Sequence, residues 1–224
     1  MKRSEINALI QDAEAFFAAH HFHLPEWGRW SPAQWKGKGE VAAEIVRNGM
    51  GWDLTDFGSG AFERRGLILF AIRNGRLGVD RKPYAEKIMI VRENQETPMH
   101  FHWYKMEDII NRGGGNLMLQ LKAATEDEAF SEESFDVSID GIVHRLACGA
   151  EVTLKPGQSI CLPQRLYHRF WGEEGKGKVL VGEVSMVNDD NTDNRFFDGV
   201  GRFPDIEEDE APYRLLVNDY PGHL

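Results

Sequence analysis

The sequence of 224 residues predicts a mainly β fold with helices confined to its N-terminal part. From Gly51 onward, short apolar runs alternate with turn residues, and no helical pattern separates one run from the next. Many short strands in this arrangement are typical of a β-sandwich or a barrel. The apolar share of 42%, with six tryptophans and 13 phenylalanines, is sufficient to fill the core of one such domain.

The first 50 residues carry the helical signals. Apolar residues recur at helical spacing between residues 4 and 20, where Ser4 can cap the helix. A second helix is expected over residues 31–46, with Pro32 in its first turn. We therefore expect residues 1–50 to form a helical extension packed on the barrel. Residues 51–224 are expected to form the barrel domain as one folding unit, with the tail from Asn188 wrapping its surface or rim.

The strands are predicted from apolar runs that end at turn signals. The first ends at Asn74-Gly75 and a later pair is joined by Asp140-Gly141, and both dipeptides favour tight turns. His144, in the second strand of that pair, is expected to face outward, whereas the acidic segment 126–133 reads as a solvated loop. The expected strands cover residues 66–73, 84–91, 116–121, 137–139, 142–146, 151–154, 159–162, 169–171 and 178–184, with a further strand that contains His100 and His102.

The pair His100 and His102 predicts a metal site. Side chains in a strand alternate between faces, so two histidines separated by one residue point the same way. With His168 from a later strand and the carboxylate of Glu107, they form a set of three imidazoles and one carboxylate. Such a set suits Mn, Fe, Ni, Co or Zn rather than Ca or Mg, and leaves positions on the ion open for chemistry. Glu107 lies at an odd spacing from both histidines, so the chain must bulge or bend between residues 103 and 106.

The histidines His20, His21 and His23 are interpreted differently. They lie where the first helix ends, and no carboxylate follows at ligand spacing. Short histidine tracts of this kind are a compositional signal only. We therefore interpret them as loop histidines.

Two charged residues interrupt apolar strands near the histidines. Lys87 lies in the strand before His100, and Glu183 lies in a strand shortly after His168. Charged side chains are rarely buried unless they are paired or functional. A functional role is one interpretation. The alternatives are that Lys87 extends to solvent at a strand end and that Glu183 pairs with an arginine on the rim.

The residues His100-Phe101-His102, Glu107 and the glycines 113–115 resemble the first sequence motif of the cupin superfamily. The second motif is similar to the spacing from Gly157 through Pro163 to His168. Arg165 stands where that motif usually has its second glycine, and Gly172 where an asparagine often closes it. The alternative interpretation is that the histidines are chance surface residues beside an ordinary turn.

Beyond these motifs, the chain resembles the D-lyxose isomerases of the cupin superfamily. The resemblance rests on residues 56–58, 86–87, 182–185 and 186–193 together with the histidine segment. It implies a cupin jelly-roll β-barrel, interconversion of D-lyxose with D-xylulose and of D-mannose with D-fructose, and a homodimer. It also implies Mn²⁺ as the usual metal, with Co²⁺, Fe²⁺, Ni²⁺ or Zn²⁺ as alternatives. The metal set maps to His100, His102, Glu107 and His168, the catalytic groups to Glu183 and Lys87, and sugar binding to Asp193 and Lys105.

The composition narrows the alternatives. A formal net charge of −10 disfavours binding to nucleic acid or anionic membranes. Two cysteines, no long apolar run and no apolar leader at the start lead us to expect a cytoplasmic protein. The metal set alone leaves other functions open: a cupin-type phosphoglucose isomerase, an Fe-dependent dioxygenase, or a cupin that binds a small molecule without catalysis. The acidic balance and the lack of a clear phosphate cradle argue against the phosphoglucose isomerase.

Overall fold

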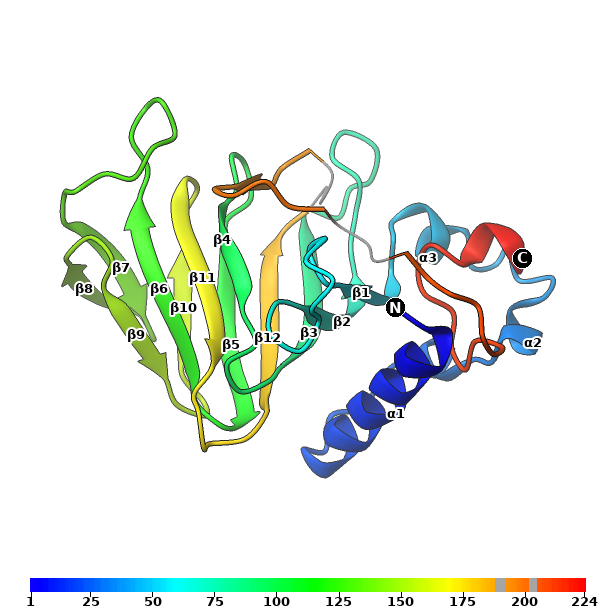
Figure 1. The fold of residues 1–224 in the computed structure, drawn as a ribbon. Helices are drawn as coiled ribbons and strands as arrows, with labels where there is room; N and C mark the ends of the chain where they lie inside the picture. The colour runs from blue at the N-terminus through cyan, green and yellow to red at the C-terminus, as the bar shows by residue number, and fades with distance from the viewer. Residues whose placement is uncertain (188–191, 202–204) are drawn as a thin grey trace.

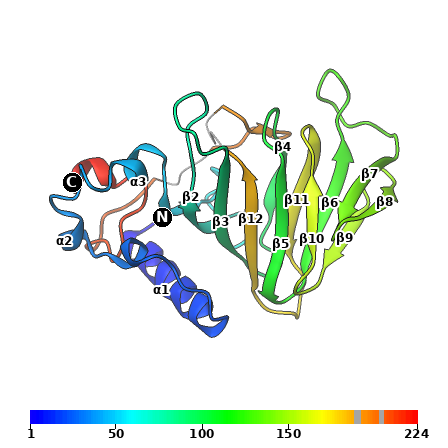
Figure 2. The same ribbon diagram turned by 180° about the vertical axis from the view of Figure 1, so that it is seen from behind.

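The computed structural model describes residues 1–187, 192–201 and 205–224. Two antiparallel sheets face each other, and a helical part lies beside one end of them (Figures 1 and 2). The helical elements are α1 (Arg3–Ala19), η1 (Glu26–Arg29), α2 (Pro32–Trp35), α3 (Ala43–Arg47) and η2 (Tyr220–Gly222). The strands are β1 (Gly51–Thr55), β2 (Leu67–Arg73), β3 (Tyr84–Val91), β4 (Thr97–Phe101), β5 (Glu107–Gly114), β6 (Leu117–Ala123), β7 (Phe135–Ile139), β8 (Ile142–Leu146), β9 (Glu151–Leu154), β10 (Ser159–Leu162), β11 (Leu166–Gly172), β12 (Val179–Met186) and β13 (Arg195–Phe196).

The two sheets differ in size and share one core. The larger sheet has the strand order β1-β2-β3-β12-β5-β10-β7-β8, and the smaller has the order β13-β4-β11-β6-β9. Their facing sides bury apolar residues from both, such as Met89 and Val181 from the larger and Leu119 and Phe170 from the smaller. This is the predicted mainly β jelly roll. Ten strands lie close to the predicted ranges, because each of those apolar runs ends at a turn residue, whereas β1, β5 and β13 were not predicted.

Helix α1 covers the outer side of β1, β2, β3 and β12. Its apolar residues Ile6, Ile10 and Phe17 are buried against Phe70 and Ile88, which point away from the cavity side of the sheet. This is the packing that the sequence predicts for the first helix. Its start differs in detail, because the helix begins at Arg3 and is capped where the backbone N–H of Lys2 donates to Glu5 Oε2.

The single helix expected over residues 31–46 is wrong. The chain instead forms the two short helices α2 and α3, separated by a turn at Gly37. Gly37 has a φ of 74°, which is outside the helical region and is readily adopted only by glycine. Among the described residues, no helix is long and apolar enough to span a membrane.

The C-terminal tail contacts two parts of the molecule, the smaller sheet and the N-terminal helices. β13 pairs with β4 at the rim of the smaller sheet, as expected for a tail that wraps the rim. The segment 205–224 instead returns to the N-terminal helices, so both ends of the chain lie in the helical part of the molecule (Figure 1). There the buried guanidinium of Arg3 donates to the carboxylates of Glu208 and Asp219, and Trp35 packs on Tyr220.

Candidate active site

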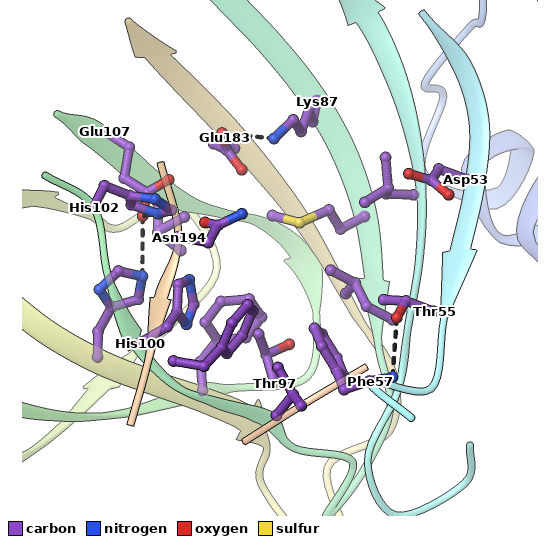
Figure 3. Close-up of a pocket in the computed structure, with 18 of the residues that line it drawn as sticks. Asp53, Thr55, Phe57, Lys87, Thr97, His100, His102, Glu107, Glu183 and Asn194 are labelled. Atoms are coloured by element: carbon purple, nitrogen blue, oxygen red, sulfur yellow. Dashed lines mark hydrogen bonds and ion pairs between the residues drawn. The ribbon is translucent and has the colours of Figure 1, made fainter. Parts of the chain in front are cut away.

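A cavity of about 330 Å³ lies between the two sheets. Its lining includes seven of the eight predicted site residues, and Asp193 is the exception. The remaining lining residues come mainly from β1, β2 and the segment that contains β13 (Figure 3). The lining consists of Asp53, Thr55, Phe57, Leu67, Leu69, Lys87, Met89, Thr97, His100, His102, Lys105, Glu107, Ile109, His168, Phe170, Glu183, Asn194, Phe196, Val200 and Gly201.

The three predicted histidines meet on the side of this cavity formed by the smaller sheet. His100 on β4 is the register partner of His168 on β11, and His102 follows the end of β4. Their ligand nitrogens all lie within 4.8 Å of one another, and all three side chains are buried. The sequence spacing therefore predicted a cluster that adjacent strands bring together.

Each histidine ring is oriented by a backbone carbonyl. The Nδ1 atoms of His100, His102 and His168 lie 2.8, 2.7 and 3.0 Å from the carbonyl oxygens of Pro98, Asp193 and Leu166. A carbonyl oxygen only accepts, so Nδ1 carries the proton and donates it. The lone pair of each Nε2 is then available to a metal, which is the usual arrangement of metal-binding histidines.

Burial keeps His100 and His102 neutral. It lowers the pKa of His100 far below the ordinary value of 6.5, and the neighbouring His168 lowers it further. Burial also lowers the pKa of His102, with a further contribution from the charge of Lys105. Neutral imidazole is the form that binds a metal, so at neutral pH no proton has to leave these two rings first.

Glu107 approaches the cluster from the opposite sheet. β4 ends at Phe101, the chain bends at Trp103 and Tyr104, and β5 begins at Glu107, which confirms the predicted bend. Glu107 Oε1 lies 3.4 Å from His102 Nε2 and 3.0 Å from His168 Nε2. Burial raises the pKa of Glu107, but the charge of Lys105 and the contacts to His102 and His168 together outweigh burial and hold the pKa well below the usual range.

The donor atoms of this cluster fit a divalent metal ion. Nε2 of His102 and Nε2 of His168 are buried and have no hydrogen-bond partner among the described residues. With Nδ1 protonated, these nitrogens and Glu107 Oε1 are all acceptors, so they repel one another unless a cation lies between them. Ligand atoms about 2.1 Å from one ion and at right angles to each other are about 3 Å apart, which is close to the spacing found here.

Four of the charged groups that line the cavity come from β3, β5, β12 and the segment before β5. Glu183 on β12 is the register partner of Lys87 on β3, and its Oε1 lies 3.4 Å from Lys87 Nζ. Lys105 Nζ lies 3.0 Å from the same oxygen and 2.6 Å from Glu107 Oε2. Lys87 and Glu183 are 7% and 5% exposed, so Lys87 does not extend to solvent, and within the described part of the chain Glu183 pairs with lysines rather than with a rim arginine.

The charge balance of this group keeps Glu183 ionised. Burial raises its pKa, but Lys105 and then Lys87 lower it, and the net effect is a pKa below the ordinary value of 4.5. Glu183 is therefore a carboxylate at neutral pH, with two lysines close to it. A carboxylate of this kind can accept a proton from a substrate held beside the histidines.

Asp193 fixes the segment that connects β4 to β5 by hydrogen bonds to its backbone. Its carboxylate accepts the backbone N–H groups of Tyr104 and Lys105, each at 2.9 Å, and its carbonyl accepts from His102 Nδ1. The structure thus places Asp193 beside the site, where it orients a histidine and the backbone of Lys105. Residues 188–191 of the segment that suggested Asp193 lie outside the described residues.

Other residues singled out by the sequence have clear positions. Arg165, which replaces a motif glycine, has a φ of 59° and so adopts the left-handed conformation that a glycine would supply. Its N–H donates to the carbonyl of His102. His144 is exposed on β8, as predicted, and His20 Nδ1 contacts the carbonyl of Phe16 at the end of α1.

Sequence reasoning missed several cavity residues. Asp53 and Thr55 come from β1, Asn194 and Phe196 from the C-terminal segment, and Thr97 from the start of β4. None of them belongs to a spaced motif. Thr97 lies three residues before His100, so a regular strand would turn it to the opposite face.

Comparisons with known proteins identify the family. The sequence model described as D-lyxose isomerase matches residues 1–220. Proteins named D-lyxose/D-mannose isomerase from Serratia proteamaculans and Escherichia coli O157:H7 are each 49% identical over 223 residues, which cover 98% of this chain and 98% of theirs. The fold is similar to that of L-ribose isomerase from Cellulomonas parahominis, with a TM-score of 0.63, 16% identity, and coverage of 92% of this chain and 98% of that one. The chain belongs to the D-lyxose isomerase family.

Proposed function

We propose that this protein is an aldose–ketose isomerase that interconverts D-lyxose with D-xylulose and D-mannose with D-fructose. The relatives at 49% identity carry the name D-lyxose/D-mannose isomerase. The observation that carries the proposal is the buried carboxylate of Glu183, which lines the same cavity as a cluster of three buried imidazoles. Aldose–ketose isomerisation through proton transfer requires a proton acceptor close to a group that polarises the carbonyl, and a metal bound by the histidines would supply that polarisation.

His100, His102, Glu107 and His168 would hold a divalent metal, which we propose to be Mn²⁺. Imidazole and carboxylate ligands together favour such transition metals over Mg²⁺ or Ca²⁺. When bound, the ion polarises the sugar's carbonyl and adjacent hydroxyl and so makes the C2 proton more acidic. The protein's contribution is to orient the three imidazoles through their contacts to backbone carbonyls.

The charged residues opposite would carry out the proton transfer. Glu183 removes the proton from C2 of the aldose, which gives an enediol, and returns it to C1 to give the ketose. Meanwhile one proton moves from O2 to O1. Lys87 and Lys105 lie 3.4 and 3.0 Å from Glu183 Oε1, where their ammonium groups can donate to a developing alkoxide. Lys105 also contacts the sugar in this proposal, whereas Asp193 supports the site from behind through its contacts to the backbone.

We further propose a homodimer in the cytoplasm. Tyr84 on β3 and Met186 on β12 are register partners that are 51% and 45% exposed, and Val184 beside them is 42% exposed. These three residues form an apolar surface on the outer side of the larger sheet that a second subunit could cover. Both cysteines are free, which is compatible with a reducing compartment.

The test is to strip the metal with a chelator, add back single ions, and measure ketose formation from D-lyxose, D-mannose and glucose 6-phosphate. Mn²⁺ or Co²⁺ should restore activity on the two free sugars more fully than Mg²⁺. Full activity in the stripped protein would contradict metal dependence. A preference for glucose 6-phosphate would favour a phosphoglucose isomerase, oxygen consumption with Fe²⁺ a dioxygenase, and stabilisation by a sugar without turnover a binding protein.

A further inference from the structure

We propose that Thr97 binds a hydroxyl group of the sugar at the end of the cavity away from Glu183, and thereby contributes to substrate selection. The proposal rests on the proposed function, because it takes a sugar as the occupant of the cavity. Four features of Thr97 carry it: an irregular strand that turns the residue inward, deep burial, a hydroxyl without a partner, and apolar neighbours.

A bulge in β4 places Thr97 on the cavity side. His168 pairs with His100, and Phe170 pairs with Thr97, so two steps along β11 match three steps along β4. The extra residue in β4 reverses the alternation of side chains, and both Thr97 and His100 therefore face inward. Without the bulge, one of these two residues would point away from the cavity.

The Thr97 hydroxyl is buried without a hydrogen-bond partner. The residue is 4% exposed, and no group of the described residues bonds to its Oγ1 atom. The great majority of buried side-chain polar atoms have a partner, because an unpaired one destabilises the folded protein. Valine has nearly the same shape without this penalty, so the hydroxyl has no structural use here. It does, however, line the cavity where a sugar would bind.

The surroundings of Thr97 suit a neutral hydroxyl rather than a charged group. Apolar side chains of Phe57, Phe170 and Phe196 line the same cavity, and none of the described lining residues is an arginine. A threonine hydroxyl can both donate to and accept from a sugar hydroxyl. Figure 3 shows Thr97 on the opposite side of the cavity from Glu183 and Lys87, so the group it binds belongs to the part of the sugar remote from C1 and C2.

The experiment compares Thr97→Val and Thr97→Ser with the wild-type protein loaded with Mn²⁺. Binding of D-lyxose's inert alditol is measured by calorimetry, and KM and kcat are measured with D-lyxose. Thr97→Val should weaken alditol binding and raise KM by roughly 2- to 13-fold, the value of one neutral hydrogen bond. Its metal content should not change, and its melting temperature should not fall. Thr97→Ser keeps the hydroxyl and should restore most of the binding.

Thr55→Val is the matched control for stability. Thr55 lines the same cavity, but its Oγ1 accepts the backbone N–H of Phe57 at 2.9 Å. Its replacement leaves that N–H without its partner, so Thr55→Val should lower the melting temperature. A comparable fall in Thr97→Val would show that the Thr97 hydroxyl has a structural role and would overturn the proposal.

Singly deoxygenated lyxoses then identify the hydroxyl concerned. One of them should bind more weakly to the wild type and show no further loss with Thr97→Val, because both changes remove the same contact. Equal binding of all sugars by Thr97→Val and wild type would overturn the proposal, and so would losses that add for every deoxy sugar. Failure of the wild type to isomerise any aldose would instead contradict the proposed function, while the alditol measurement would still test Thr97.

Discussion

The two sides of the cavity are constructed differently. The histidine side, formed by His100, His102 and His168, belongs to the smaller sheet and the residue that follows β4. Each of its rings is fixed by a contact to a backbone carbonyl. The charged side, formed by Lys87, Lys105, Glu107 and Glu183, belongs to the larger sheet and the segment before it. Its members are held by ion pairs between side chains.

This difference matches two chemical tasks. Metal ligands must stay in place, and a ring fixed to the backbone is preorganised for that purpose. A proton carrier must exchange partners during each turnover, and a carboxylate held by two flexible lysines can do so. The account therefore assigns metal binding to the histidine side together with Glu107, and proton transfer to the remainder of the charged side. The following predictions test that division.

The largest effect is expected on the histidine side. His168→Ala removes one of three converging nitrogens, so the purified protein should retain little metal and lose turnover with it. Metal content is measured by elemental analysis after dialysis. The matched control is His144→Ala, because His144 is exposed on β8 and lies outside the cavity lining. Stoichiometric metal in His168→Ala would show that the second histidine motif has been misread.

A smaller effect is expected from the lysines, and it concerns stability. Lys105 contacts two buried carboxylates at 2.6 and 3.0 Å, whereas Lys87 contacts one of them at 3.4 Å. Lys105→Met leaves Glu107 without a lysine partner and Glu183 with Lys87 alone, and should lower the free energy of unfolding of the metal-free protein by about 3–5 kcal/mol. Lys87→Met should lower the free energy of unfolding by a smaller amount. Urea unfolding of both variants measures the difference, and equal losses would contradict the central position given to Lys105.

The sequence predicted the histidine side more completely than the charged side. The positions of His100 and His102 follow from strand alternation, and that of Glu107 from the required bend. Lys87 and Glu183 were found because charged residues are unusual in apolar strands. The role of Lys105 as the link between Glu107 and Glu183 depends on a bend and on distances between sheets, which no local pattern encodes. Thr97 was missed because a bulge reverses the alternation on which such predictions rest.

The fold was also predicted only where local sequence patterns determine the structure. The ranges of most strands were predicted from apolar runs that end at turn signals, and α1 was predicted from its apolar spacing, but β1, β5 and β13 were not predicted. The break between α2 and α3 and the return of segment 205–224 to Arg3 were not. They depend on a left-handed glycine and on contacts between residues about 200 positions apart in the sequence.

A more gradual effect is a dependence of stability on pH. The folded protein keeps His100 and His102 neutral because burial lowers the pKa of both rings below 6.5. In the unfolded chain these rings take up protons near pH 6.5. The unfolded state then binds more protons, so the stability of the metal-free protein should fall as the pH decreases from 7 to 5, by at most about 1.4 kcal/mol per pH unit for each ring. Urea unfolding at several pH values measures this slope, and a His100→Asn variant with an unchanged slope would contradict it.

The most direct test of the division between the two sides is Glu183→Gln, measured for metal content and turnover together. Glutamine keeps the shape of the side chain but cannot accept the C2 proton. The account predicts metal content close to wild type and turnover of D-lyxose reduced by roughly 10²- to 10⁴-fold, the usual contribution of a positioned general base. A Glu183→Gln protein with bound Mn²⁺ and a nearly normal rate would contradict the account.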